Sequence, residues 1–507
     1  MAWRKKDKWL IFTILFITFY TLLFTFLLIL RYKSFFSYEW EDEAALHQMV
    51  WNTAHGRWFY TSIGVENQYF FMGHFRPIIF LQSIIYRISP HIYNLFLMIS
   101  ITLSIGALPL FLIARRMLRN SLSAFIISLS YLLYSPLHNI NFFGTDSVIL
   151  AVPFFFFLLL IVENNFYQSN SYKLYIFILL CLLALMCKEN VGFTIIFLSI
   201  YLFIIGNKRP AFFCFIFATI WLLITIPFTQ RLNVPQGYSL ARSLEYSSFK
   251  ELVSTFFNRP TYLVLQGLSF NHLQYLFKVL MPVAFLPLLS LVGYISMPAL
   301  IQLILINGVI GYTKVDILSL ALPFLFVGMT QSMGNISKFI SRKISLKDTD
   351  ITLIIATFVL ILNILNLFGN NILGNIPENA VIYDRRFINV KNIFDPIFYI
   401  MDEEDKTAWS FVSMIPKGAS VSATGDLLPA LSNRANLLEL FNENYDYLNA
   451  EYILFHTRYV GFGAGDYTKM DNSKMYRLIN EMKVNSRWLI LREENNFILF
   501  KRKRGFN

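Results

Sequence analysis

The sequence predicts a mainly α-helical protein, in which a polytopic bundle of transmembrane helices is followed by a small α/β domain. Its 507 residues are 56% hydrophobic and 17% aromatic, with a mean hydropathy of +0.53, far outside the range of soluble proteins. Apolar runs long enough to cross a bilayer recur through residues 1–369. After residue 369 the apolar residues form short groups separated by Asn, Gly and Asp, as in a soluble domain.

The net charge of +12 belongs to the membrane part. Residues 370–507 contain 17 basic and 17 acidic side chains, so essentially all of the excess lies in residues 1–369. Short loops of membrane proteins carry such an excess on the cytoplasmic side. The partner that this charge implies is therefore the lipid bilayer and not nucleic acid.

The first membrane helix is predicted at residues 9–30. This run is apolar and uncharged for 22 positions, enough to span a bilayer at about 1.5 Å per residue, and basic residues precede it. No small-residue cleavage site follows, so we expect a retained helix with a cytoplasmic N-terminus.

Ten further apolar runs bring the expected number of spans to about eleven. They are residues 92–114, 121–138, 147–163, 173–187, 191–206, 210–228, 276–292, 298–312, 317–334 and 350–368. Alternating sides then places most basic clusters in the cytoplasm of a multi-pass plasma (inner) membrane protein. The same alternation makes the first loop (31–77), the segment 229–275 and the C-terminal domain extracytoplasmic.

The C-terminal domain is predicted to hold a β-sheet. Residues 419–424, 451–455, 488–492 and 496–501 have the composition of strands, and residues 427–434 have helical periodicity. We expect a small α/β domain tethered by the last helix.

The first loop begins with an acidic stretch. Glu39, Glu41, Asp42 and Glu43 fall within five positions, and Asp42 recurs with apolar residues at helical spacing, which predicts an amphipathic helix at the membrane surface. The glutamates can simply complement the helix dipole. Asp42 is expected on the face turned toward protein or lipid, where a carboxylate can act as a general base or bind a metal.

Further charged residues lie near the predicted extracytoplasmic ends of the helices. His74 and Arg76 suit a phosphate oxygen, although such residues before a helix can also snorkel. Asp146 and the pair Lys188 and Glu189 lie at membrane depth, where charges are usually functional, yet the pair could merely end a span.

The segment 229–275 adds Arg242, which would suit an anionic ligand or a solvated loop face. Walker-type phosphate loops, GxGxxG, HExxH and paired CxxC motifs are missing from the sequence, which argues against ATP-driven chemistry.

Several motifs spread over the chain carry a family resemblance. They are WNTAHGRW at 51–58, HFRPIIF at 74–80, RISPHIYNLF at 87–96, KEN at 188–190 and IPKGASVSATGDLLPALSNR at 415–434. With them the chain resembles a family of uncharacterised prokaryotic polytopic membrane proteins of unknown function. In architecture that family is similar to the C-type glycosyltransferases, whose first extracytoplasmic loop carries an acidic catalytic residue.

The resemblance transfers to individual positions. Asp42 matches the acidic residue of the first-loop motif, His74 matches the family's HFxP, and Lys188 with Glu189 matches its Lys-Glu pair. Two positions depart from the pattern: His47 replaces a second acidic residue, and Asp146 replaces a usual His.

The resulting hypothesis is a glycosyltransferase that moves a sugar from a polyprenyl-phosphate carrier to an acceptor glycan, lipid or protein on the outer face. Asp42 is the expected base, with Glu41 and Glu43 as substitutes. Expected phosphate contacts are His74, Arg76, Lys188 and Arg242, while Glu189 and Asp146 orient them or bind an optional divalent metal such as Mg²⁺ or Mn²⁺. A transporter or flippase, or an assembly scaffold, is the alternative.

Overall fold

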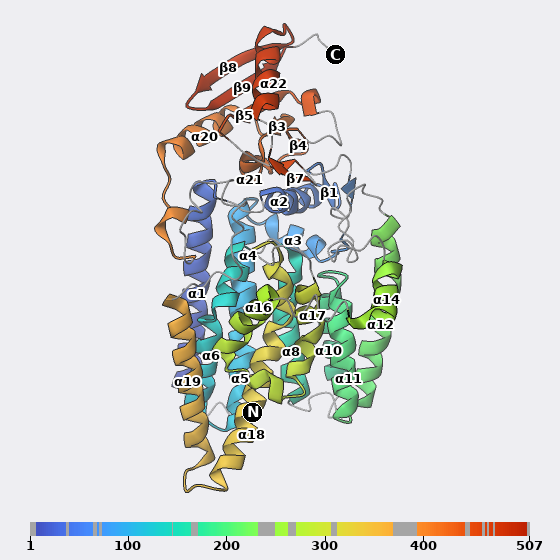
Figure 1. Cartoon of the computed structure of the whole chain (residues 1–507), viewed down its shortest axis with the longest axis vertical. Coiled ribbons are helices and arrows are strands. Elements are labelled where there is room, and N and C mark those ends of the chain that lie inside the picture. Colours follow the sequence, from blue (N-terminus) through green and yellow to red (C-terminus); the bar gives the residue numbers. More distant parts are fainter. Residues whose placement is uncertain are drawn as a thin grey trace.

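The structure is a computed structural model that describes most of residues 7–503. The residues left out within that range are 37–39, 64–67, 70–73, 144–145, 164–170, 232–248, 262–269, 306–311, 369–392, 442–446, 459–461, 464–465 and 470–471. Long helices run side by side in a bundle, and the C-terminal domain lies over one of its ends (Figure 1). We call this end the domain end.

Within the described residues, four helical segments are long and apolar enough to cross a membrane. They are α1 (Lys8–Lys33), α4 and α5 together (Ile92–Ile105 and Ala107–Leu118), α12 (Lys208–Arg231) and α19 (Asp348–Phe368). Shorter apolar helices fill the space between them: α6 (Ser121–Leu132), α8 (Ala151–Glu163), α10 (Ser171–Leu185), α11 (Val191–Ile204) and α17 (Met297–Leu305). The multi-helix membrane bundle is thus confirmed.

Proline interrupts two of the predicted spans. The expected span 276–292 contains α16 (Phe270–Leu280) and then two short 3-10 turns, η2 (Met281–Val283) and η3 (Leu286–Leu289), which include Pro282 and Pro287. Proline lacks the N–H group that continues a helix, so a single straight span over these residues is wrong.

The expected span 121–138 is also broken. It ends as α6 at Leu132, and α7 (Ser135–Phe143) begins just before Pro136.

The predicted span 317–334 likewise divides into two elements. η5 (Tyr312–Leu320) is followed by α18 (Leu322–Ser341), with Pro323 in the first turn of α18. The preceding 3-10 turn η4 (Gly293–Ser296) leads into α17. Between α12 and α16 in the sequence the structure also describes α14 (Phe249–Asn258).

The bundle core is filled by large aromatic side chains. Tyr131 and Phe156 are fully buried with ring centroids 5.3 Å apart. Gly106, at the junction of α4 and α5, lies against both: an added Cβ would be 2.8 Å from the Phe156 ring. Only glycine therefore lets α4 and α5 pass this close to α8.

The C-terminal domain contains a five-stranded mixed sheet with strand order β4-β3-β5-β9-β8. Its strands are β3 (Val421–Ala423), β4 (Leu437–Glu439), β5 (Tyr452–His456), β8 (Trp488–Glu494) and β9 (Phe497–Arg502). β3 pairs in parallel with β4 and β5, whereas β9 runs antiparallel to β5 and β8. The four predicted strands are all present.

Helices cover both faces of this sheet. α22 (Asn472–Val484) packs Met475 and Ile479 against one face, and α20 (Glu403–Met414) packs Phe411 against the other. Neither helix, nor β4, was predicted from the sequence. The helix predicted at 427–434 is only four residues long, α21 (Leu428–Leu431), preceded by η9 (Gly425–Leu427).

The first loop shares a hydrophobic core with the C-terminal domain. Buried residues of α2 (Trp40–Ala54), such as Ala45 and Met49, belong to the same cluster as Leu431 and Leu454 of the domain. Figure 1 shows α2 lying between the domain and the bundle, with α3 (Ile79–Tyr86) below it. The domain is therefore packed onto the first loop, a contact that the sequence did not predict.

A short hairpin completes the first loop. β1 (Tyr60–Thr61) pairs antiparallel with β2 (Gln68–Tyr69). A second hairpin in the C-terminal domain pairs β6 (Phe462–Gly463) with β7 (Asp466–Lys469).

Candidate functional site

Helix α2 presents one carboxylate to solvent and one to the protein interior. All side chains from Glu43 to Val50 are buried, because the helix is enclosed by the C-terminal domain on one side and α3 on the other. Asp42 is exposed. The expectation that Asp42 is turned toward protein is thus wrong. The expectation of an amphipathic surface helix is wrong as well, because the C-terminal domain covers α2.

Glu43 is the buried carboxylate of the acidic stretch. Its Oε2 lies 2.7 Å from Nη2 of Arg31, in the last turn of α1, and both side chains are about 95% buried. The guanidinium of Arg31 also lies over the ring of Phe142, 5.3 Å from its centroid. A buried ion pair of this kind fixes the geometry between two elements, since separating the charges would leave each uncompensated.

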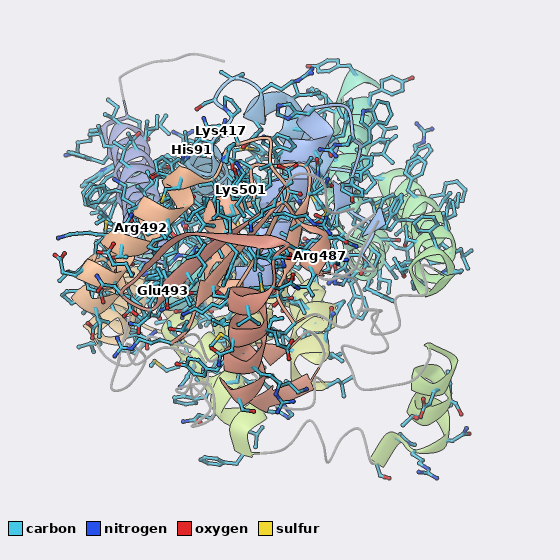
Figure 2. The ribbon with its side chains drawn as sticks, turned by 90° about the horizontal axis from the view of Figure 1, so that it is seen from above. His91, Lys417, Arg487, Arg492, Glu493 and Lys501 are labelled. Carbon is cyan, nitrogen blue, oxygen red and sulfur yellow. The ribbon has the colours of Figure 1, made fainter. Side chains whose placement is uncertain are left out.

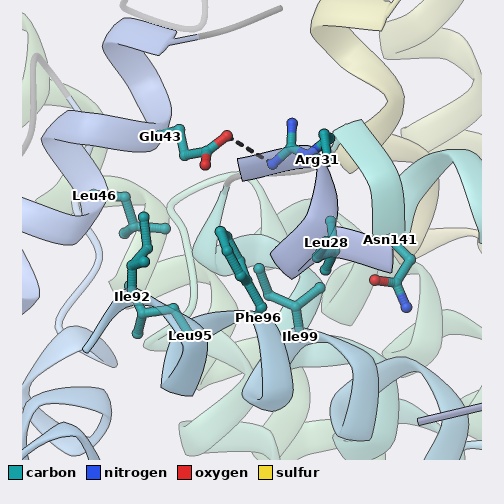
Figure 3. A pocket seen from close by; sticks show the side chains of 9 residues that line it. All are labelled: Leu28, Arg31, Glu43, Leu46, Ile92, Leu95, Phe96, Ile99 and Asn141. Atoms are coloured by element: carbon teal, nitrogen blue, oxygen red, sulfur yellow. Dashed lines mark hydrogen bonds and ion pairs between the residues drawn. The ribbon is translucent and has the colours of Figure 1, made fainter. Parts of the chain in front are cut away.

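A small pocket opens beside this ion pair (Figure 3). It is lined mainly by apolar side chains of α1, α2 and α4, including Leu28, Leu46 and Phe96. The Arg31 and Glu43 pair forms its polar end. The pocket is thus an apolar recess with a charged rim at the domain end.

A second group of charges surrounds Asp146, which follows α7 in sequence. Its carboxylate accepts a hydrogen bond from Nζ of Lys188 and lies 3.4 Å from Nη1 of Arg76. All three side chains are about 90% buried. Asp146 also caps the 3-10 turn η1 (Ser147–Leu150) by accepting from the backbone N–H of Val148. Asp146 therefore begins the 3-10 turn η1 and places its carboxylate between the two cations.

His74 and Glu189 extend this group. Oε1 of Glu189 lies 2.6 Å from Nδ1 of His74, and Oε2 accepts from the backbone N–H of Phe75 at 3.1 Å. Because Lys188 and Glu189 are neighbours in the turn between α10 and α11, one turn binds both the 74–76 segment and Asp146.

Asp316 also belongs to this group of charges, and it was not predicted from the sequence. Its Oδ2 lies 4.0 Å from Nζ of Lys188. The signal was present in the sequence as a single acid inside the apolar stretch 298–334, which is costly in a membrane and therefore points to function. We call Arg76, Asp146, Lys188, Glu189 and Asp316, with His74, the charge cluster.

The structure thus brings together five of the predicted site residues: His74, Arg76, Asp146, Lys188 and Glu189. Asp42 and Glu43 lie on a different element, α2, where Glu43 is paired with Arg31. Arg242, Glu39 and the side chain of Glu41 lie outside the described residues.

A divalent metal does not fit the described part of the cluster. Mg²⁺ prefers several oxygen ligands, but among the described residues no three His, Cys, Asp or Glu side chains are grouped so that they could hold an ion. Asp146 is instead engaged by two cations. We therefore derive no chemical step through a metal.

His47, where the family resemblance expects an acid, joins three elements. Ser432 Oγ donates to the carbonyl of Pro429, so it accepts from Nδ1–H of His47 at 2.6 Å. Nε2 of His47 then accepts from the hydroxyl of Tyr86 at 2.7 Å. Burial lowers the pKa of His47 to about 3, which keeps the ring neutral as this arrangement requires.

Gln48 makes the next connection along α2. Its Oε1 accepts from Oγ1 of Thr61 and the backbone N–H of Ser62, and its Nε2 donates to Oγ of Ser62. Ser62 in turn exchanges hydrogen bonds with the backbone of Leu437 in β4. The first loop and the C-terminal domain are therefore joined by a satisfied polar network as well as by an apolar core.

These features define the class: a multi-pass membrane protein with a buried charge cluster at one end of a helical bundle and a soluble α/β domain packed over that end. The chain belongs to the family described as "Predicted membrane protein (DUF2079)", whose model matches residues 31–499. This confirms the family resemblance read from the motifs.

Among solved structures the chain is similar to ArnT from Cupriavidus metallidurans in the apo state. The TM-score is 0.48 at 9% sequence identity, over 90% of this chain and 93% of that chain. At this identity the likeness says nothing about function. Among curated proteins, no sequence matches the chain significantly.

Proposed function

We propose that the protein is a membrane glycosyltransferase that moves a sugar from a polyprenyl-phosphate donor to an acceptor at the domain end of the bundle. The observation that carries the proposal is the buried contact of Lys188 and Arg76 with Asp146. Burying two cations costs free energy, and charged side chains within membrane segments generally mark functional sites. Two cations at the mouth of a membrane bundle suit the phosphate of a lipid carrier.

The chemistry requires charge stabilisation when the phosphate leaves the sugar. Lys188 supplies a compact ammonium and Arg76 a guanidinium that can donate two parallel hydrogen bonds. Asp146 holds both cations in the absence of substrate, and Glu189 fixes His74 beside them. These groups are therefore positioned before the substrate arrives, which is what makes electrostatic stabilisation effective.

The acceptor hydroxyl must lose a proton, and Asp42 suits this role better than Glu43. Glu43 is bonded to Arg31 in a buried pair, whereas Asp42 is exposed on the first turn of α2. A general base has to reach the proton that it removes. Glu41 remains the substitute from the acidic stretch.

The position of the charges favours transfer over transport. A transporter places its substrate site near the bilayer midplane, between repeats or broken helices. The structure describes several buried charged side chains in residues 7–368. Each belongs either to the Arg31 and Glu43 pair or to the charge cluster, and both groups lie toward the domain end. In the proposed topology this end faces the extracytoplasmic side, where a polyprenyl-linked donor is used.

The test is mass spectrometry of the lipids that copurify with the protein in gentle detergent. We compare wild type, Asp42→Asn and a matched control, Asp350→Asn, which changes an exposed acid in the first turn of α19 at the opposite end. We expect a polyprenyl-phosphate sugar, enriched severalfold in Asp42→Asn because that variant binds the donor without consuming it. Equal amounts in all three proteins would exclude Asp42 as the base.

The same proteins are then mixed with added polyprenyl-phosphate sugars. A rise in melting temperature is expected for all three, because binding stabilises the folded state. If no such lipid copurifies and none of the added lipids raises the melting temperature, the transferase proposal fails.

A further inference from the structure

Two exposed corners of the chain meet beside the domain end of the bundle. The first is the turn between α3 and α4, in which the five consecutive residues 87–91 are all exposed. The second is the turn between α20 and β3, with Pro416, Lys417 and Gly418 exposed. Figure 2, which looks onto the domain end, shows His91 and Lys417 side by side. The pKa of His91 is lowered by partial desolvation of its ring and by the ammonium of Lys417, which agrees with this proximity.

The first corner directly precedes a candidate membrane span. α4, which belongs to a candidate membrane span, begins at Ile92, directly after the first corner. Aromatic side chains typical of a membrane interface lie at the end of α1. The ring of Trp409 in α20 is 5.4 Å from that of Tyr32. Its indole N–H donates to the carbonyl of Lys33. In a bilayer crossed by α1 and α4, both corners would adjoin the headgroups at this end of the bundle.

Apolar side chains of α3 and of the residues just after it are exposed beside the first corner. Ile84 and Ile85 are 51% and 45% exposed, and Ile88 is 84% exposed, whereas Ile79 and Tyr86 on the other face are buried. A short helix with one apolar face open and the other packed on protein is suited to lie in the bilayer interface.

The polar groups of the corners suit a phosphate. Arg87 and Lys417 are exposed cations, and neither corner, residues 87–91 or 414–418, contains an acidic residue. His91 adds a neutral donor, because its Nδ1 accepts from the backbone N–H of Tyr93 and the remaining proton is on Nε2.

The position of Lys417 is fixed by the fold. Buried Arg434 donates from Nη1 to the carbonyl of Ala419 at 3.1 Å and to that of Pro416 at 3.4 Å, which holds the turn closed. Arg434 also offers its own carbonyl to Gln48 of α2. The backbone on both sides of Lys417 is therefore held by the same network that joins the domain to the first loop.

We propose that these two corners form a headgroup-binding surface for anionic phospholipids of the leaflet at the domain end, with Arg87, Lys417 and His91 binding the phosphate and Ile84, Ile85 and Ile88 entering the acyl region. The surface lies outside the charge cluster and does not depend on the proposed transfer reaction. The surface would hold the C-terminal domain on the membrane. The contact of that domain with α2 acts in the same direction. Cations at a membrane surface contribute about 1 kcal/mol each to such binding.

The experiment uses a fluorescent label on a single introduced cysteine of the full-length protein in nanodiscs. The three native cysteines are buried, so Ile88→Cys can be labelled selectively. Val484→Cys is the control, because Val484 is also an exposed apolar residue, 87% exposed, at the end of α22 on the far side of the sheet. Quenching is compared between brominated phosphatidylcholine and brominated phosphatidylglycerol at equal bromine content.

We expect quenching at position 88 by both lipids, with a marked excess for phosphatidylglycerol, and none at position 484. Arg87→Gln with Lys417→Gln should remove the excess, raising the fraction of phosphatidylglycerol needed for half-maximal quenching at least tenfold, since about 1 kcal/mol per charge is lost. Arg477→Gln with Lys474→Gln, exposed cations of α22, should leave the excess unchanged. No quenching at 88, equal quenching by the two lipids, or an excess that survives the Arg87 and Lys417 changes would overturn the proposal.

Discussion

His47 donates a hydrogen bond from Nδ1 to Oγ of Ser432, 2.6 Å away, although the two residues are 385 positions apart in the chain. The bond connects the first loop to the C-terminal domain, and the second nitrogen of the same ring accepts from Tyr86 below. The helix that carries the acidic stretch is thus held from both sides. Its position relative to the bundle depends on a domain that the chain builds last.

Replacing His47 should loosen this connection. In His47→Leu the Tyr86 hydroxyl and Ser432 lose a buried partner, which costs about 1–3 kcal/mol for a buried polar group left unpaired. We expect a lower melting temperature in detergent and faster hydrogen exchange in α2 and α21. The control is His55→Leu, an exposed histidine at the end of the same helix. An equal effect of the two changes would contradict the role given to His47.

Acid should weaken the same connection. Burial lowers the pKa of His47 to about 3, so the folded protein keeps the ring neutral while the unfolded chain binds a proton below pH 6.5. The stability that this residue contributes is full above pH 6.5 and is lost as the pH falls from there toward 3, with a slope of up to about 1.4 kcal/mol per pH unit. Melting temperatures measured from pH 7 to 5 should fall less steeply in His47→Gln than in wild type.

How far the sequence predicted the fold depends on how local each signal is. The spans at α1 and α19 were found because a helix facing lipid must be apolar along its length. The breaks near Pro282 and Pro287 were overlooked because the surrounding residues remain apolar. Strand β4 was missed because it is only three residues long and is stabilised by parallel pairing with β3.

The candidate site shows the same limit. The charges of the cluster could be recognised because ionisable residues at membrane depth are rare. Their pairing could not, since Asp146 meets Lys188 and Arg76 only after three separate segments come together. The exposure of Asp42 and the burial of Glu43 depend on the C-terminal domain packing over α2, more than 350 residues later in the chain. Periodicity within α2 contains no information about that contact.

His456 should make the C-terminal domain sensitive to base. Burial alone would lower its pKa, but the carboxylates of Asp426, 2.6 Å from Nδ1, and Glu404, 3.1 Å from Nε2, raise the pKa to about 9. A raised pKa contributes stability that is full below the unfolded value of 6.5 and is lost as the pH rises through 9. We expect the melting temperature of the domain to fall between pH 7 and 9.5.

Removing the ring separates this effect from general alkaline unfolding. In His456→Gln the fall between pH 7 and 9.5 should be shallower. The melting temperature at pH 6.5 should be lower, because Asp426 and Glu404 lose the cation that they share, although Glu404 keeps its contact with Arg458. Hydrogen exchange in β5 and α20 reports the local change. A pH profile parallel to that of wild type would show that His456 is not the titrating group.

The contact of Lys188 with Asp146 allows structure and activity to be separated. Lys188→Met leaves the buried Asp146 carboxylate with Arg76 as its cation, and breaking a buried pair from one side costs about 3–5 kcal/mol. The double variant Lys188→Met with Asp146→Asn removes one cation and one carboxylate together. The net charge of the cluster is then that of wild type, so the double variant should regain much of the lost melting temperature. Lys338→Met, an exposed lysine of α18, is the control and should resemble wild type.

Sugar transfer should not follow the same pattern. If Lys188 stabilises the departing phosphate, both variants lack that charge, and turnover should fall by a factor of at least about 100, as for loss of one group that stabilises the transition state. The decisive measurement is therefore turnover of the double variant at a temperature where it is fully folded. Recovered stability with absent turnover supports a catalytic cation, because a structural ion pair replaced by uncharged groups would restore both. Recovery of turnover together with stability would reduce the pair to a structural contact.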